Sequence, residues 1–350
     1  MRGEAQSEAW SLPASRKARL MRVGFIGLGN VGGKLAGSLL RNGFEVAVLD
    51  LNPLLMESFA AKGAARGESP RQLAESCDVV ITCLPSPAAC AAVVEGQDGI
   101  LEGIGPGRIW AEMSTTDAGE VRRLAGLVAA RGGEAIECPV SGGCHRAATG
   151  NISIFAGGAR QTFERMLPLL TVLGRRVLHT GEIGSASVLK VVTNYLATVN
   201  LVSLAEALTT CKAAGMDLGT AYEAIRISSG NSFVHETESQ VILNGSRDIS
   251  FTMDLVAKDV GLFQKIADDH QVPLEVSPLI NRIFADGIDR YGPRELSPNI
   301  IRRLEEATGL DIRAPGFPEE MVDDEPEEAG YEVTPKRGGE MKLNRWEAAG

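Results

Sequence analysis

The strongest constraint on the fold is an alternation of strand-like and helix-like segments that fills the first half of the chain. Short runs rich in β-branched and apolar residues alternate with longer runs of helical periodicity. The strand candidates are residues 22–27, 45–50, 78–84, 108–113, 134–140, 152–158 and 176–181. This rhythm predicts an α/β fold with a doubly wound parallel sheet, because parallel neighbours require helical crossovers between them.

The strand signals stop after Gly181, which divides the chain in two. Residues 183–214 form one long and mostly apolar helical pattern, and Gly215 is placed to end it. So apolar a helix must be buried on most sides, between domains or against another subunit. We therefore expect a sheet domain over residues 21–182. An interdomain helix and an all-α C-terminal domain should follow over residues 183–313.

The two ends of the chain differ from the body in composition. Residues 1–20 lack a coherent apolar period and an apolar signal core, so we expect a disordered extension rather than a secretory signal. Residues 314–350 hold ten acidic and four basic residues, and we expect an acidic disordered tail. Because this tail carries −6 of the net charge of −10, the body shows no excess positive charge for binding nucleic acid.

Composition also bounds the cellular setting. No uninterrupted apolar run approaches the roughly 20 residues of a membrane span, so we expect no membrane partner. The six cysteines show no CxxC spacing and several lie in apolar runs. We interpret them as reduced residues of a cytoplasmic protein, with no disulfide framework and no metal site.

The sequence GLGNVG, residues 27–32, matches the glycine pattern of dinucleotide-binding loops. A strand precedes it, a helix follows it, and a second strand ends in Asp50, 21 residues after Gly29. In this context the glycines allow a tight turn and a close approach to a pyrophosphate, and Asp50 can accept hydrogen bonds from ribose hydroxyls. The acidic side chain favours NAD over NADP. The alternative is a plain strand–helix turn in which Asp50 caps the next helix. The candidate cofactor residues of the loop are Gly27, Leu28, Gly29, Asn30, Val31 and Gly32.

Lys190 and Asn194 lie four residues apart in the long helix, so an ammonium and an amide share one helical face. Burial would lower the pKa of the lysine and let it exchange a proton near neutral pH. The amide can donate to a substrate hydroxyl or carboxylate. The alternatives are a lysine that reaches solvent and an amide that only caps backbone.

A Ser-Gly-Gly turn, residues 141–143, follows a strand candidate. Ser141, Gly142 and Gly143 can present backbone N–H groups and a hydroxyl to a carboxylate, or they can form a plain turn. Arg146 could pair with a second anionic group of a substrate, or it could be solvated. The role of His145 is equally open.

Several segments in this order resemble the β-hydroxyacid dehydrogenase family, which includes 3-hydroxyisobutyrate dehydrogenases. They are GFIGLGNVGGKLAGSLL, CPVSGGCHRAATGNISIFAGG, the helix with Lys190 and Asn194, SSGNSF and FTMDLVAKDVGLF. The resemblance covers about residues 21–310. It implies a Rossmann domain, a long interdomain helix, an α-helical C-terminal domain and a homodimer or homotetramer. It also implies reversible NAD(P)-linked oxidation of a small anionic 3-hydroxy acid to a semialdehyde or keto acid.

The resemblance also assigns site residues. Lys190 falls on the family's catalytic lysine and Asn194 on its amide partner. Leu84, Pro85, Thr115 and Lys258 fall on cofactor contacts. One departure is Thr193, where the family commonly has a second asparagine.

Several functions fit these residues. The leading one is an NAD-dependent 3-hydroxyisobutyrate-like dehydrogenase with Lys190 as general acid and base. Reductases of tartronate semialdehyde, glyoxylate or succinic semialdehyde, and a dehydrogenase for a substrate with a second anionic group, stay open. A non-catalytic NAD-binding module is a different class, and the intact Lys190 and Asn194 argue against it.

Overall fold

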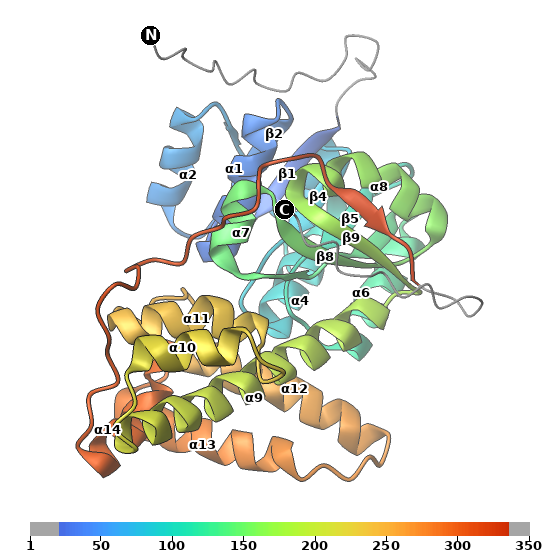
Figure 1. Cartoon of the computed structure of the whole chain (residues 1–350). Helices are drawn as coiled ribbons and strands as arrows, with labels where there is room; N and C mark the ends of the chain where they lie inside the picture. The colour runs from blue at the N-terminus through green and yellow to red at the C-terminus, as the bar shows by residue number, and fades with distance from the viewer. Residues whose placement is uncertain (1–20, 336–350) are drawn as a thin grey trace, which may run out of the picture.

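The computed structural model describes residues 21–335, and the expectations for residues 1–20 and 336–350 lie outside this range. The described chain has a sheet flanked by helices, followed by a helical domain (Figure 1). The predicted fold class is therefore confirmed.

The sheet has ten strands, in the order β10-β9-β8-β6-β5-β4-β1-β2-β3, with β7 paired to β8. The strands are β1 (Arg22–Ile26), β2 (Glu45–Leu49), β3 (Ala65–Arg66), β4 (Val79–Thr82), β5 (Ile109–Glu112), β6 (Glu134–Glu137), β7 (Val140–Ser141), β8 (Ile152–Gly157), β9 (Gly174–Gly181) and β10 (Tyr331–Val333). All neighbouring pairs are parallel except those that join β8 to β6 and to β7.

Two details differ from the prediction of a wholly parallel sheet. The candidate strand 134–140 is two strands, β6 and β7, interrupted at residues 138–139, where Pro139 lacks the N–H for a continuous ladder. The chain then reverses through the Ser-Gly-Gly turn and α7, and β8 enters the sheet antiparallel to β6 and β7. This reversal places the turn at the end of β7 rather than within a crossover.

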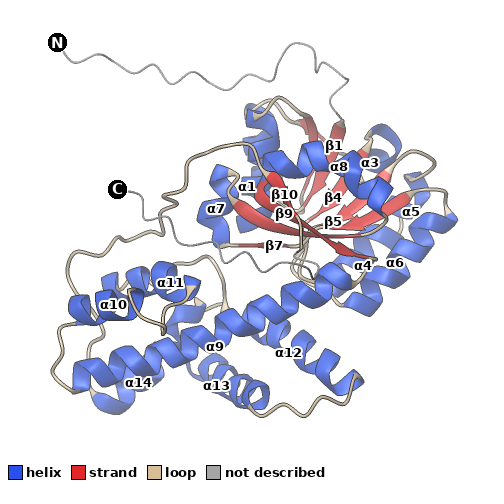
Figure 2. Ribbon diagram, turned by 45° about the vertical axis from the view of Figure 1, so that its right-hand side comes forward, coloured by secondary structure: helices blue, strands red, loops and turns tan. Residues whose placement is uncertain are grey.

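Helices cover both faces of the sheet (Figure 2). They are α1 (Asn30–Arg41), α2 (Pro53–Ala61), α3 (Pro70–Ser76), α4 (Pro87–Glu95), α5 (Ile100–Gly103), α6 (Ala118–Ala130), α7 (Gly143–Thr149) and α8 (Arg160–Leu173). Every residue of the central strand β4 is buried, and its side chains alternate between two cores. Val79 and Ile81 enter one core and Val80 the other, which explains why the strand reads as a continuous apolar run.

The long helix α9 (Ser185–Ala213) runs from the sheet domain through the helical domain (Figure 2). Around it pack α10 (Leu218–Arg226), α11 (Phe233–Asn244), α12 (Met253–Asp269), α13 (Val276–Tyr291), the 3-10 helix η2 (Ser297–Ile301) and α14 (Arg302–Thr308). A separate core that includes Leu204, Leu208 and Phe284 holds this domain together.

By length and composition α9 is the one described helix that could cross a membrane, with a mean hydropathy of 1.4 over its most apolar window. It also packs against β8, β9, α11 and α12, and it carries Lys190 and Asn194. A central helix shared by two domains accounts for the pattern.

The expectation of a disordered tail from residue 314 is wrong for residues 314–335. This segment leaves the helical domain, passes α7 and reaches the edge of the sheet as β10 (Figure 1, red). Tyr331, Glu332 and Val333 pair in parallel with residues of β9. Arg146, Arg175 and Arg176 pair with acidic side chains of the segment. Composition alone indicated disorder because the cationic partners lie far away in the sequence.

Candidate active site

The glycine loop between β1 and α1 is shaped by two close approaches of the backbone, at Gly27 and Gly32, and by one open position, at Gly29. A Cβ on Gly27, whose φ is +98°, would lie 2.3 Å from the carbonyl oxygen of Cys83. A Cβ on Gly32 would lie 2.1 Å from the carbonyl oxygen of Gly27, so the first turn of α1 needs this glycine to pack on the loop. Gly29, just before α1, faces open space, where a phosphate can approach the helix N-terminus.

Asp50, directly after β2, faces the glycine loop. One carboxylate oxygen accepts a bond from the backbone N–H of Leu28 (2.6 Å) and the other from that of Asn52 (2.8 Å). Each oxygen keeps a further lone pair with which it can accept a ribose hydroxyl. Val31 is half-buried in α1, and the amide of Asn30 donates to the carbonyl of Ser250 (3.2 Å), which links the loop to the helical domain.

The loops after β4 and β5 lie together, because these strands are parallel neighbours. The backbone N–H of Leu84 donates to the hydroxyl of Ser114 (2.7 Å), next to Thr115, and Pro85 follows at the surface. Lys258, from α12, donates to the carbonyl oxygen of Thr115 (2.8 Å). The predicted cofactor residues of these loops and of the helical domain thus meet in one place.

A buried carboxylate positions the start of α9. Glu137, at the end of β6, is fully buried and accepts bonds from the backbone N–H groups of Gly184 (2.6 Å), Ala186 (2.8 Å) and Ser187 (3.1 Å). The hydroxyl of Ser187 also donates to it. Burial raises the pKa of Glu137, while these bonds act to lower it. The carboxylate satisfies donors that a helix N-terminus leaves unpaired, and it fixes the helix that carries Lys190.

Lys190 and Asn194 belong to a chain of four polar side chains between α9 and α12. The ammonium of Lys190 donates to the side-chain oxygen of Asn194 (2.6 Å), and the amide nitrogen of Asn194 donates to Asp259 (2.5 Å). The other oxygen of Asp259 lies 2.8 Å from the ammonium of Lys258. The chain connects the two catalytic candidates to the lysine that touches Thr115.

Burial lowers the pKa of Lys190 to about 8. Of its charged neighbours, Asp259 raises this pKa and Lys258 lowers it. A lysine at this pKa is partly neutral near physiological pH and can both accept and donate a proton. The alternative of a side chain reaching solvent does not hold, because Lys190 is buried.

Asp259 is the site residue that sequence reasoning missed. It is buried next to Lys258 in the segment AKDVG, and its carboxylate holds the amide of Asn194 in place. The available signal was a charged residue at a buried helical position, but its partner on α9 lies 65 residues away in the sequence. Thr193 does not contribute its hydroxyl to the chain, because this group donates to the carbonyl of Lys190.

The Ser-Gly-Gly turn lies at the end of β7, which packs against α9. Gly142 (φ +131°) and Gly143 (φ +88°) adopt backbone conformations that favour glycine. Among the hydrogen bonds of residues 21–335, none joins Ser141 to Lys190. The turn and the lysine are related by the packing of β7 against α9.

Arg146 and His145 follow the turn in α7. Arg146 is neither solvated nor free: its guanidinium lies 3.0 Å from Glu325 and 3.8 Å from Asp323 in the tail segment. Burial and the charge of Arg146 lower the pKa of His145, and Asp323 raises it. Among the hydrogen bonds and ion pairs of residues 21–335, none joins His145 to Lys190, Asn194 or Asp259, and we assign it no chemical role.

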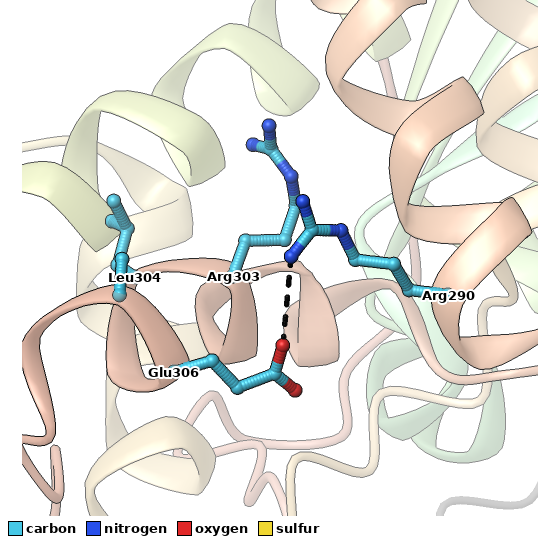
Figure 3. A pocket seen from close by; sticks show the side chains of 5 residues that line it. Arg290, Arg303, Leu304 and Glu306 are labelled. Atoms are coloured by element: carbon cyan, nitrogen blue, oxygen red, sulfur yellow. Dashed lines mark ion pairs between the residues drawn. The ribbon is translucent and has the colours of Figure 1, made fainter.

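Other features of the described residues add no second centre. Within residues 21–335 no group of three or more His, Cys, Asp or Glu side chains is arranged to hold a metal ion. A shallow pocket between α13 and α14 is lined by Arg290, Arg303, Leu304, Glu306 and Ala307 (Figure 3). Its arginines are already paired with acidic side chains, as the Arg290–Glu306 contact of 3.6 Å illustrates.

Comparison with known proteins gives consistent matches over both domains. Residues 22–181 match the model for the NAD binding domain of 6-phosphogluconate dehydrogenase, and residues 184–304 match that for NAD-binding of NADP-dependent 3-hydroxyisobutyrate dehydrogenase. The chain is 32% identical over 293 residues to 2-(hydroxymethyl)glutarate dehydrogenase of Eubacterium barkeri, covering 83% of this chain and 97% of that protein.

A second relative is the NAD-dependent L-serine dehydrogenase of Pseudomonas aeruginosa, 34% identical over 255 residues, or 71% of this chain and 86% of that protein. Among solved structures, 3-hydroxyisobutyrate dehydrogenase from Salmonella typhimurium superposes with a TM-score of 0.74 at 27% identity. That match covers 81% of this chain and 99% of the solved one.

Proposed function

The chain belongs to the β-hydroxyacid dehydrogenase family, whose members are NAD(P)-dependent enzymes acting on hydroxy acids. We propose that it oxidises a small 3-hydroxy acid with Lys190 as the general base. The observation that carries this proposal is the series of linked side chains Lys190–Asn194–Asp259–Lys258, in which the buried lysine has a pKa of about 8. A buried lysine needs polar partners in any role, but the lowered pKa of Lys190 suits it to exchange a proton with a substrate hydroxyl near neutral pH.

The residues have separate tasks in the oxidative direction. The nicotinamide, when bound, supplies the hydride acceptor. Neutral Lys190 takes the proton of the substrate hydroxyl, and in the reverse direction its ammonium returns that proton and stabilises negative charge on the carbonyl oxygen. Asn194 holds the lysine nitrogen through its oxygen. One amide hydrogen binds Asp259 and the other is left for the substrate.

The remaining predicted residues support a small carboxylic acid and NAD. The Ser-Gly-Gly turn offers N–H groups and the Ser141 hydroxyl to the substrate carboxylate. Asp50 has lone pairs for two ribose hydroxyls, and its negative charge would repel a 2′-phosphate. We therefore propose NAD as the cofactor and 3-hydroxyisobutyrate or a similarly small acid as the substrate.

A second candidate is a 3-hydroxy acid with two carboxylates. It is favoured by the 32% identity to a protein named 2-(hydroxymethyl)glutarate dehydrogenase and by the cationic Arg146 beside the Ser-Gly-Gly turn.

The test is a substrate panel, followed by the absorbance of the reduced nicotinamide, with NAD and NADP in parallel. It should include 3-hydroxyisobutyrate, L-serine and 2-(hydroxymethyl)glutarate. We expect turnover with NAD on at least one small 3-hydroxy acid, and a higher kcat/KM with NAD than with NADP. The absence of turnover with every substrate of the panel, together with intact NAD binding, would refute the proposal in favour of a non-catalytic binding module.

A further inference from the structure

The tail contains an acidic strap, residues 319–333, that crosses from the helical domain to the sheet beside α7 (Figure 1). The strap has eight acidic residues and no basic one: Glu319, Glu320, Asp323, Asp324, Glu325, Glu327, Glu328 and Glu332. It lies beyond residue 304, where the match to the second family model ends. The strap therefore lies outside both family-model matches.

Two carboxylates of the strap converge on Arg146. The guanidinium of Arg146 donates to Glu325 (3.0 Å), and its Nε lies 3.8 Å from Asp323. The side chain of Asp323 is only 2% exposed and also accepts bonds from Thr149 and from Asn151 (2.7 Å). Burial alone would raise the pKa of Asp323, but these bonds and Arg146 hold it below its usual range, so the carboxylate is ionised at neutral pH.

Arg146 connects the strap to the substrate turn. Its Cδ lies 3.3 Å from the position that a Cβ on Gly142 would take, so its stem packs on the turn. Its guanidinium lies over the ring of Phe233, 4.7 Å from the centroid, at the start of α11 in the helical domain. The strap also reaches the turn directly, because the methyl group of Met321 lies 3.8 Å from the corresponding position on Gly143.

We propose that the acidic strap is a specificity-determining element, whose Asp323 and Glu325 occupy Arg146 and withhold it from a second anionic group of the substrate. An unpaired arginine beside the carboxylate-binding turn would favour a dianionic substrate through a charge-assisted pair. Asp323 and Glu325, which also pairs with Arg176 (3.1 Å), offset the positive charge of Arg146, so a second carboxylate of the substrate has no unpaired guanidinium to bind. The site then prefers 3-hydroxy acids with a single carboxylate. This inference rests on the proposed function.

Two substrates isolate the effect. In 3-hydroxyisobutyrate and 2-(hydroxymethyl)glutarate the reacting hydroxymethyl group and the adjacent carboxylate are the same, and only the second adds a distal carboxylate. The readout is the ratio of kcat/KM for the dianion to kcat/KM for the monoanion. Damage to the fold or to the Lys190 chain would lower both values together and leave the ratio unchanged, so the ratio reports charge recognition alone.

The variants are Asp323→Asn with Glu325→Gln, then the same pair with Arg146→Gln added. The amides keep an acceptor oxygen for Thr149, Asn151 and Arg146, so the strap stays bound while its charge is removed. We expect the first variant to raise the ratio about tenfold, mainly through a lower KM for the dianion, as a charged hydrogen bond allows. Adding Arg146→Gln should return the ratio to near the wild-type value.

Glu332→Gln is the matched control. Glu332 belongs to the same strap but pairs with Arg160, away from the turn, so the ratio should not change. An unchanged ratio in the first variant would overturn the inference, and so would a rise that persists without Arg146. If the wild-type enzyme turns over neither substrate nor any other acid of the panel, the proposed function fails instead. Turnover with an unmoved ratio refutes only the strap's role.

Discussion

At the residue scale, the proton-transfer properties of Lys190 depend on two neighbours on α12 with opposite effects. Burial and Lys258 lower the pKa of Lys190, and Asp259 raises it, with a result of about 8. Without the carboxylate the lysine would be neutral over a wider pH range. In the proposed reaction Asp259 would keep enough ammonium for the reductive direction, while burial would keep enough free amine for the oxidative one.

Asp259→Asn should shift the pH dependence of activity. The substitution removes the charge that raises the Lys190 pKa, so kcat/KM for oxidation should rise at lower pH than in the wild type. Reduction near neutral pH should fall, because less ammonium is present. The measurement is the pH profile of kcat/KM in both directions. Asp269→Asn, an exposed position on the same helix paired with Lys265, should leave the profile in place. An unshifted profile in Asp259→Asn would contradict this electrostatic role.

The spacing of Lys190 and Asn194 was readable from the sequence because helical periodicity relates residues four apart. Asp259 was not, because its position against Asn194 follows from the packing of α12 on α9. Likewise, the glycine loop has a local signature, whereas the pairing of Arg146 with Asp323 and Glu325 depends on how the tail returns to the sheet domain.

At the element scale, α9 depends on Glu137 for its starting point. Strands and helices were predictable where the apolar pattern of one segment defines the element, as for β4 and α9. The direction of β8 was not predictable, because it depends on how β8 pairs with β6 and β7 after the turn and α7. The buried cap on α9 was also invisible, since Glu137 reads in the sequence as an ordinary strand-end residue.

Glu137→Gln should destabilise the protein. An amide offers one acceptor oxygen where the carboxylate offers two, and its NH2 group would face backbone donors. At least one buried N–H of Gly184, Ala186 or Ser187 would lose its partner, at a cost of roughly 1–3 kcal/mol. Urea unfolding at fixed protein concentration measures the loss. Glu134→Gln, a half-exposed position of the same strand, should cost less than about 1 kcal/mol. Equal losses of unfolding free energy in the two variants would show that Glu137 does not stabilise the start of α9 beyond the contribution of an ordinary ion pair.

At the whole-molecule scale, the tail covers one edge of the sheet, whereas α9 has an apolar stripe that the described chain leaves exposed. The carboxylates of the tail pair with arginines up to 179 residues away in the sequence, and β10 covers the edge of β9. A composition-based prediction of disorder could not anticipate this, because it treats the acidic residues as having only one another for neighbours.

One stripe of α9 has no such cover in the described chain. Leu189 (39% exposed) and Leu196 (53% exposed) lie seven residues apart on one face, with the half-buried Val192 between them. This heptad-like spacing is typical of a helix–helix interface. We propose that a second copy of the chain covers it.

Leu196→Glu should therefore shift the protein towards smaller species in sedimentation velocity. Placing a carboxylate at the centre of an apolar interface leaves a charge without a partner. Ile227→Glu, which changes a 79% exposed apolar side chain outside α9, should not alter the assembly. A wild-type protein that stays monomeric at micromolar concentration would contradict the proposed interface, as would equal dissociation of both variants.

The most direct test of the account as a whole is Lys190→Arg, assayed on the best substrate of the panel across pH. Arginine keeps the positive charge but does not release its proton in this range, so it cannot act as the base. We predict that wild-type kcat/KM for oxidation rises with a pKa of about 8. The variant should lose at least about 100-fold of this activity at every pH while still binding NAD. A variant that kept more than about a tenth of wild-type turnover, with the same pH profile, would contradict the assignment of Lys190 as the proton-transferring group.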